Sequence, residues 1–195
     1  MRSGPNTSLQ RDPERERTLL QAVVRRDRAA FAELYRLYHP RLHGYLRRIL
    51  ANAAIAEEVF DDVMFVVWTD ARKFRGDAAV STWIFGIAYR KAMTAARKES
   101  RHDAAIDRGV DADLLPAGKP RDLESINVAL AALSADHRQV VELTYFCGFS
   151  YQEIADIADC PVNTVKTRMF HARRRLRFLL PALDNPGKEQ NREQQ

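Results

Sequence analysis

Apolar residues recur at helical spacing along most of the chain, and the segment Ser150–Leu180 shows this pattern most clearly. Its first part, with Ile154 and Ile157, predicts a short helix. Asp159–Pro161 predicts a turn, because proline suits the first turn of a following helix. The apolar side of that second helix is Val162, Val165, Met169, Ala172, Leu176 and Leu179. No stretch alternates as a strand would, so the pattern predicts an all-α fold.

This helix pair has the layout of a DNA-binding helix-turn-helix, and Ser150 with Glu153 predicts a capping box at its start. The polar side of the second helix combines basic and small hydrogen-bonding residues: Asn163, Thr164, Lys166, Thr167, Arg168, His171, Arg173 and Arg174. A merely solvated helix face usually mixes both signs of charge, but no acid occurs between Pro161 and Leu180. We therefore expect this side to contact the phosphates and base edges of DNA.

The N-terminal half predicts a separate bundle of helices. Asp27 can cap a helix whose apolar positions run from Phe31 to Ile49, and Pro40 must kink or split that helix. The next helix, over about residues 55–73, has an apolar stripe and a carboxylate-rich N-terminal half, which suits the positive end of a helix dipole. A turn is expected at Phe74–Asp77.

A further helix, predicted from about Ser81 to Arg101, combines aromatic and basic residues. With the preceding turn it carries these candidates for nucleic-acid contact: Arg75, Trp83, Tyr89, Arg90, Lys91, Thr94, Arg97 and Lys98. The combination suits a single-stranded site, because bases stack on rings while basic side chains bind phosphates. The alternative, that aromatic residues such as Trp83 and Phe85 are simply core residues, stays open at this point.

Helical periodicity is lost over residues 103–122, where aspartates outnumber basic residues and glycine and proline interrupt any helix. We expect a flexible acidic linker here, joining two small helical domains at residues 14–102 and 123–181. The polar tails at residues 1–13 and 182–195 are expected to be disordered.

Composition narrows the function only slightly. The net charge of +5 favours an anionic partner. No apolar run reaches the roughly 20 residues that a membrane span requires. The N-terminus lacks the apolar segment of a secretory signal, so we expect a cytoplasmic protein. Cys147, Cys160 and His171 lack the paired spacing of a zinc site, so we expect neither a metal nor a cofactor.

Three blocks of sequence together resemble the sigma-70 family of bacterial RNA polymerase initiation factors, and its small extracytoplasmic-function (ECF) group in particular. They are EEVFDDVMFVVWTDARKFRGDAAVSTWIFGIAYRKA, then LSADHRQVVELTYFCGFSYQEIADIADCPVNTVKTRMFHARRRL, and the acidic linker between them. The resemblance covers about Phe31 to Leu180. It implies a protein without catalytic activity that gives core RNA polymerase its promoter specificity.

The resemblance also implies a role for each helix. The acidic helix matches the segment that docks on the clamp helices of the largest polymerase subunit. Its matching residues are Glu58, Asp61, Asp62, Phe65 and Trp68. The aromatic and basic helix matches the part that recognises and melts the minus-ten promoter element. The second helix of the helix-turn-helix matches the reader of the minus-thirty-five element, and the linker would run near the active-site and RNA-exit channels.

Two further partners are implied by the same resemblance: the flap of the second polymerase subunit and an anti-sigma factor, which is often membrane-bound. Two positions depart from the family pattern. Gly86 stands where the family often has a basic residue, and Arg90 stands where it often has asparagine. Both lie on the minus-ten helix, so the preferred bases cannot be carried over.

Two other classes of function compete with this interpretation. A free-standing helix-turn-helix regulator would explain Ser150–Leu180 but would leave Trp83 and the acidic helix without a role. A nuclease would need a carboxylate cluster to hold metals, and Asp61 and Asp62 are sequence neighbours that point in different directions on one helix.

Overall fold

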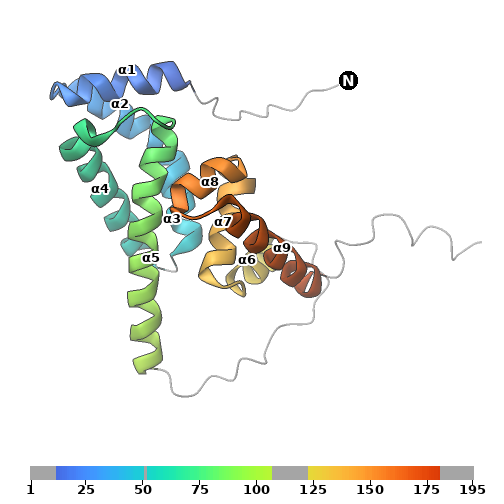
Figure 1. Cartoon of the computed structure of the whole chain (residues 1–195). Helices are drawn as coiled ribbons and strands as arrows, with labels where there is room; N and C mark the ends of the chain where they lie inside the picture. Colours follow the sequence, from blue (N-terminus) through green and yellow to red (C-terminus); the bar gives the residue numbers. More distant parts are fainter. Residues whose placement is uncertain (1–11, 51, 107–122, 181–195) are drawn as a thin grey trace, which may run out of the picture.

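The computed structural model describes residues 12–50, 52–106 and 123–180, and every regular element in these ranges is a helix (Figure 1). The predicted all-α fold is therefore confirmed. Residues 107–122 of the predicted linker and nearly all of both predicted tails lie outside the described residues. A long helix, α5 (Val80–Ile106), runs through the centre, with α4 on one side and the C-terminal helices on the other (Figure 1).

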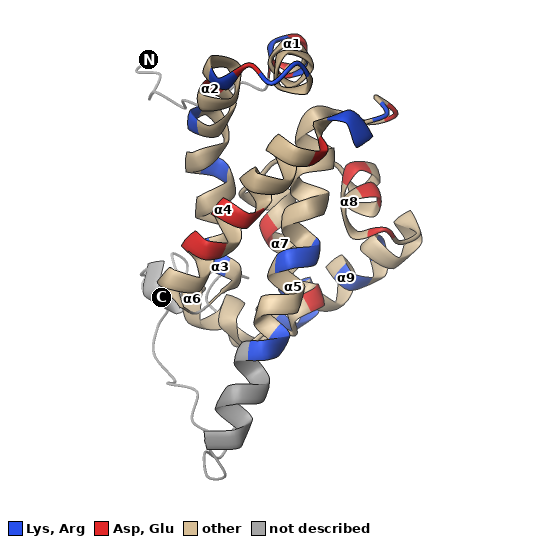
Figure 2. Ribbon diagram, turned by 90° about the vertical axis from the view of Figure 1, so that its left-hand side faces the viewer, with Lys and Arg blue, Asp and Glu red and all other residues tan. Residues whose placement is uncertain are grey.

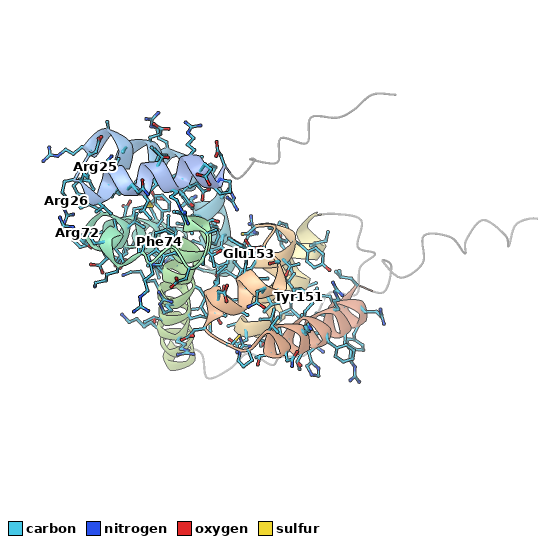
Figure 3. All side chains as sticks on the ribbon, turned by 45° about the horizontal axis from the view of Figure 1, so that its top comes forward. Arg25, Arg26, Arg72, Phe74, Tyr151 and Glu153 are labelled. Carbon is cyan, nitrogen blue, oxygen red and sulfur yellow. The ribbon has the colours of Figure 1, made fainter. Side chains whose placement is uncertain are left out.

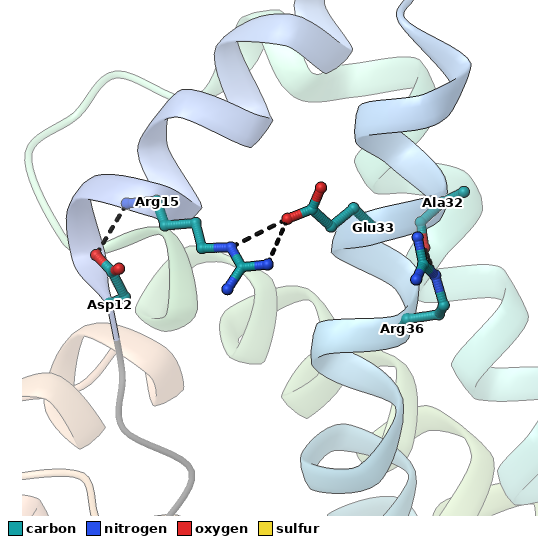
Figure 4. Close-up of polar contacts among 5 residues, drawn as sticks. All are labelled: Asp12, Arg15, Ala32, Glu33 and Arg36. Atoms are coloured by element: carbon teal, nitrogen blue, oxygen red, sulfur yellow. Dashed lines mark hydrogen bonds and ion pairs between the residues drawn. The ribbon is translucent and has the colours of Figure 1, made fainter.

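Two capped helices open the fold, α1 (Pro13–Val24) and α2 (Arg28–Tyr38). The predicted cap Asp27 accepts hydrogen bonds from two backbone amides in the first turn of α2, which satisfies donors that a helix start otherwise leaves unpaired. Arg15 on α1 donates through Nε and Nη2 to one carboxylate oxygen of Glu33 on α2, at 3.0 and 2.6 Å (Figure 4). This surface contact joins the two helices above their apolar interface.

The prediction that Pro40 splits the following helix is confirmed. Because proline has no amide hydrogen, the α-helical ladder is interrupted and the chain passes through one π-helical turn, η1 (His39–His43), before α3 (Gly44–Ile49). Leu42 and Tyr45 remain fully buried through this change of helix type. The π turn thus re-aims the chain without exposing its apolar side.

The remaining N-terminal elements are α4 (Ala53–Asp70), a short 3-10 turn η2 (Ala71–Lys73) and α5. The predicted turn at Phe74–Asp77 separates η2 from α5, and Gly76 there has a φ of +83°, which favours glycine. Helix α5 continues to Ile106, further than the predicted end, so the first residues of the predicted linker are helical.

Four helices form the C-terminal part: α6 (Leu123–Ala131), α7 (Ala135–Tyr145), α8 (Tyr151–Ala158) and α9 (Val162–Leu179). The pair α8 and α9 is the predicted helix-turn-helix. Gly148 has a φ of +69° just after α7, the left-handed conformation in which glycine commonly ends a helix.

Local signals at the helix-turn-helix are confirmed one by one. Ser150 and Glu153 form the capping box, each side chain bonding to the backbone of the other residue. Asp159 ends α8 in the left-handed conformation, with a φ of +49°, and α9 begins directly after Pro161. The apolar stripe of α9 faces the core, with these residues buried: Val165, Met169 and Ala172.

The N-terminal and C-terminal parts of the chain pack against one another and share buried apolar residues. Phe85 on α5 meets Phe149, just before α8, with ring centroids 4.8 Å apart in an edge-to-face arrangement. Gly86 lies so close to α8 that a Cβ on it would lie 3.7 Å from the carbonyl oxygen of Ile157. This glycine lets α5 and α8 approach each other closely.

Two polar contacts between α3 and α7 also join the N-terminal and C-terminal parts of the chain. Arg48 Nε donates to Glu142 Oε2, and the Glu142 side chain is 0% exposed. The Tyr45 hydroxyl hydrogen-bonds Gln139 Oε1, and both side chains are fully buried. Buried polar groups are costly unless paired, so these contacts fix one relative placement of α3 and α7.

The Glu142 carboxyl depends on its partner for its charge. Burial raises the pKa of Glu142 above its ordinary value, and the hydrogen bond and positive charge of Arg48 oppose that rise. Its other oxygen, Oε1, has no hydrogen-bond partner among the described residues. A carboxyl with a raised pKa in the folded protein favours folding below its ordinary pKa, and this contribution is lost as the pH rises through the raised value.

Arg48→Ala should lower the free energy of unfolding by about 1.5–3 kcal/mol at pH 8, because it leaves a buried carboxylate unpaired. The pKa of Glu142 then rises further, so the deficit should shrink as the pH falls towards 5 and the carboxyl is protonated. Urea denaturation at both pH values measures this. The matched control is Arg47→Ala on the same helix, an exposed position where the change should stay within about 0.5 kcal/mol. Equal deficits at both pH values would contradict the assigned role of Glu142.

Candidate nucleic-acid interface

The basic side of α9 is open to solvent over most of its length. Six of the predicted contact residues are exposed: Asn163, Lys166, Thr167, His171, Arg173 and Arg174. Thr164 and Arg168 are half-buried. Because the apolar stripe of α9 packs on α7 and α8, its opposite side presents amide, hydroxyl and cationic groups together, which is the chemistry that reads a DNA groove.

Two arginines of α9 already have protein partners. Arg168 Nη2 forms a 2.7 Å ion pair with Asp136 on α7. Arg173 donates to the Tyr145 hydroxyl from Nε at 3.2 Å and from Nη2 at 2.8 Å, and this hydrogen bond is the main cause of the raised pKa of Arg173. These contacts give both side chains a structural role, whereas Lys166 projects from the exposed face.

The predicted residues on and before α5 are divided between surface and interior. Five are exposed: Arg75, Arg90, Thr94, Arg97 and Lys98. Trp83 is half-buried and packs on Phe74, with ring centroids 5.6 Å apart. Lys91 forms a 2.7 Å ion pair with Asp62 on α4. Tyr89 is only 9% exposed in this conformation.

Two pockets flank the turn before α5, and they contain residues that the sequence interpretation missed. The larger, of about 570 Å³, lies between α1 and the turn, and three arginines line it: Arg17, Arg72 and Arg75. Figure 3 labels two residues of this lining, Arg72 and Phe74. The smaller pocket, of about 220 Å³, is lined by Trp83, Arg90 and Asp156 among others. Arg17 and Arg72 were not singled out because each lies in an ordinary amphipathic helical context.

The two predicted DNA surfaces meet each other in this conformation. Helix α8 covers the part of α5 around Gly86, and Asp156 of α8 borders the same pocket as Trp83 and Arg90. Burial raises the pKa of Tyr89, Asp136 adds to the rise, and Arg168 opposes it. Tyr89 from one predicted surface therefore lies within electrostatic reach of Arg168 from the other.

The predicted docking face of α4 carries its carboxylates on the surface (Figure 2). Glu58, Asp61 and Asp62 are all exposed, and Asp61 accepts a 3.2 Å hydrogen bond from the Tyr35 hydroxyl. Phe65 is 64% exposed, which is unusual for so large an apolar side chain. An exposed ring beside exposed carboxylates suits a protein interface with a basic partner.

Trp68, the last residue predicted for this face, is half-buried and forms part of the structure between α2 and α4. Its ring centroid lies 5.1 Å from that of Phe31, and the Arg26 guanidinium lies 5.3 Å from the same ring. Arg26 Nη1 also donates to the Trp68 carbonyl oxygen at 2.7 Å. Trp68 thus supports the surface on which Phe65 stands.

An apolar groove of about 330 Å³ lies between α6, α7 and α9. It is lined by Ile126, Leu130, Val141, Tyr145, Phe146, Arg173, Leu176, Arg177 and Leu180. Tyr145 is 59% and Phe146 is 52% exposed, so the groove opens towards solvent. Helical periodicity alone could not distinguish these exposed apolar residues from core residues.

The residues considered for a metal site lie on different elements. Cys147 follows α7 and is buried, Cys160 lies in the turn before α9, and neither is part of a disulfide. His171 stacks on His137 with ring centroids 6.0 Å apart, and burial lowers the pKa of His137, with His171 adding to the effect.

No helix within the described ranges is long and apolar enough to span a membrane.

Two family models match this chain. A model described as Sigma-70 region 2 matches residues 34–102, and one described as Sigma-70, region 4 matches residues 123–176. The chain is 33% identical over 173 residues to the "ECF RNA polymerase sigma factor SigK" of Mycobacterium tuberculosis H37Rv, covering 83% of this chain and 91% of that protein. It is 32% identical over 157 residues to the "ECF RNA polymerase sigma factor RpoE" of Cereibacter sphaeroides, covering 78% and 87%.

Solved structures agree with these sequence matches. The sigma factor RpoE of Bartonella quintana, crystallised with the anti-sigma factor NepR, superposes with a TM-score of 0.63 and 28% identity, over 77% of this chain and 96% of that one. The structure of CnrH in complex with the cytosolic domain of CnrY superposes with a TM-score of 0.66 over 86% of this chain and 98% of that one. At 22% identity, this second likeness supports the fold alone.

Gly86→Leu should force α5 and α8 apart, because its Cβ would already be in contact with the Ile157 backbone and three further carbon atoms would extend from there. Overpacking costs about 1–3 kcal/mol. This would shift the equilibrium about 5–150-fold from the form in which α5 and α8 are packed together towards a form in which they are separated. Small-angle scattering should then report a larger radius of gyration. Gly86→Ala is the matched control, since its Cβ would make only ordinary contacts at 3.6 Å and beyond, and it should scatter as the parent does. Unchanged scattering from Gly86→Leu would show that α8 does not depend on this close approach.

Proposed function

This chain belongs to the extracytoplasmic-function group of the sigma-70 family, and we propose that the conformation described above is a closed form that opens on core RNA polymerase. Its function is to direct the polymerase to promoters and to initiate transcription there, and its partners are core polymerase and promoter DNA. The observation that best supports this function is the order of the two regions in one chain. The first region contains an acidic helix and an aromatic, basic helix, and the second contains a helix-turn-helix. A free-standing regulator is not favoured, because it would leave residues 34–102 without a role.

We assign minus-thirty-five recognition to the exposed side of α9. Asn163, Lys166 and Thr167 lie near its N-terminus, the end that enters the groove in helix-turn-helix proteins. Lys166 and Arg174 are suited to phosphates, and Asn163 is suited to a base edge. Arg168 and Arg173 can join the DNA contact only by exchanging their bonds to Asp136 and Tyr145.

Minus-ten recognition and melting are assigned to the turn before α5 and to the exposed side of that helix. Trp83 and Phe74 offer rings for stacking, and an unpaired base that stacks recovers roughly 1–3 kcal/mol of the cost of opening the duplex. Arg75 joins the neighbouring arginine-lined pocket, whose size and charge suit a nucleotide. Arg90, Arg97 and Lys98 extend the cationic track along α5.

The closed form explains why the free protein would bind promoter DNA weakly. Asp156 of α8 borders the Trp83 and Arg90 pocket, so the minus-ten surface is partly covered. Tyr89 and Arg168, one from each DNA surface, also lie close to each other. Separate contacts of the two regions with polymerase would supply the free energy that breaks this interface.

Two protein surfaces remain for partners. We assign the α4 face around Glu58 and Phe65 to the polymerase clamp helices, and the α6–α7–α9 groove to the flap of the second polymerase subunit. An anti-sigma factor is proposed as a further partner, supported by the relative from Bartonella quintana that was crystallised with one. The protein acts in the cytoplasm, where the polymerase is, and contributes specificity without a catalytic reaction of its own.

Core polymerase supplemented with this protein should produce specific run-off transcripts, whereas a free-standing regulator would produce none without another sigma factor.

Glu58→Lys should weaken association with core roughly tenfold or more, because it places a cation opposite a basic partner. Native-gel competition measures the affinity and run-off yield measures the function. Glu14→Lys on α1 makes the same charge change on an exposed position outside the docking face and should leave both unchanged. Equal loss in the two variants would point to net charge rather than to α4.

In the assembled holoenzyme, Lys166→Ala should weaken promoter binding about equally for all upstream sequences and lower the salt slope by about 1, because one phosphate contact is lost. Asn163→Ala should instead change the sequence preference, at a cost of about 1–3 kcal/mol for the preferred sequence. Filter binding at several salt concentrations separates the two. Arg36→Ala removes an exposed cation of α2 that bonds to the Ala32 carbonyl (Figure 4) and should keep the parental slope.

A further inference from the structure

Two imidazoles and a carboxylate converge where η1 meets α4. His39 and His43 are the first and last residues of the π-helical turn, and their rings stack with centroids 5.0 Å apart and planes 12° apart. Glu57 comes from α4, and its Oε2 lies 2.9 Å from His43 Nε2. One donor atom from each of the three residues lies within 4.8 Å of the other two. None of these residues belongs to the surfaces assigned above to DNA or polymerase.

Aromatic neighbours hold the two imidazoles in place. The fully buried Phe60 presents its ring to both, with centroids 4.9 Å from His39 and 6.3 Å from His43. Tyr35 stacks on His39 at 6.1 Å and lies 5.0 Å from Phe60, so the three rings form one cluster. This packing limits the positions that the His39 side chain takes.

The surroundings of the trio are acidic. Tyr35, which stacks on His39, donates its hydroxyl hydrogen bond to Asp61, and burial followed by Asp61 and Glu57 raises its pKa. Arg41 lies in the same π turn, but it reaches away to the Cys147 carbonyl oxygen, at 3.3 Å, and to the ring of Phe85. A dication at the trio would therefore meet carboxylates rather than a competing positive charge.

We propose that His39, His43 and Glu57 form a binding site for a divalent transition-metal ion, most simply Zn²⁺. Two imidazole nitrogens and one carboxylate oxygen are a donor set that suits zinc and its neighbours rather than calcium or magnesium. Tetrahedral bonds of about 2.0–2.2 Å place donors roughly 3.4 Å apart, so the two imidazole rings would turn out of their parallel stack until both nitrogens point at one ion. Glu57 would turn from His43 Nε2 to the ion, and water would take the remaining position.

Such an ion would bridge two elements that are separate in the chain. His39 and His43 belong to the turn created by Pro40, and Glu57 belongs to the first half of the docking helix α4. Binding to the folded protein alone would stabilise it by mass action, and it would add positive charge one helical turn from Asp61.

The full-length protein, freed of metal with a chelator that is then removed, should bind one equivalent of ZnCl2 in calorimetry. At 100 times the dissociation constant, zinc should raise the melting temperature by about 5 °C or more. Substituted Co²⁺ should show the visible absorption of a site with nitrogen and oxygen donors and no thiolate. Failure to bind zinc below millimolar concentration would overturn the proposal.

Glu57→Gln and His43→Ala should each weaken zinc binding at least tenfold, because each removes a ligand, and the metal-free melting temperature of each variant shows whether it folds. His137→Ala is the matched control, since it removes one ring of the other stacked imidazole pair, on α7 and α9, and should bind zinc as the parent does. If His137→Ala lost binding while Glu57→Gln kept it, the metal would sit in the C-terminal region and the proposal would be wrong.

Discussion

The interface between the two regions contains an ion pair between Arg48 and the fully buried carboxylate of Glu142, set beside the hydrogen bond between Tyr45 and Gln139. A buried carboxylate without a cation is costly, whereas the pair as a whole adds little net stability over apolar residues of the same size. Its effect is therefore on specificity: α3 and α7 have one satisfactory placement. Beside these contacts α5 packs on α8, where Phe85 meets Phe149 and Gly86 lies next to the Ile157 backbone.

This placement connects the two DNA-binding regions of the sigma factor to each other. Side chains that would meet promoter DNA also lie at the closed interface: Tyr89 of α5 is nearly buried and lies within electrostatic reach of Arg168 of α9. DNA binding and interface formation therefore compete for common groups. Such competition would weaken DNA binding by the free protein without a separate inhibitory segment. The strength of binding is then set by the free-energy difference between the closed and the open form. On the proposed docking assignment, polymerase is the partner that shifts the balance by binding the two regions separately.

Helix α4 serves several purposes at once because its faces differ. Its buried side, around Phe60 and Val63, anchors α2 and α5, while its outer side exposes Phe65 among carboxylates. Its N-terminal turns bring Glu57 to the histidines of η1. The π turn that Pro40 induces is what aligns those histidines with α4, so a local backbone irregularity has created a donor cluster away from the promoter-binding surfaces.

The sequence alone determined the all-α fold class, the helix ends set by Asp27 and by Ser150 with Glu153, the break at Pro40 and the basic side of α9. These features depend on neighbours within about one helical turn, so a single sequence contains the whole signal. The contacts of Arg48 with Glu142, the arginine-lined pocket and the His39, His43 and Glu57 trio were decided only by the tertiary structure. Each joins residues from different helices, and each partner, taken in its own sequence context, has the pattern of an ordinary amphipathic helix. Which of those helices meet is decided by the packing of the whole core, and that information is not local.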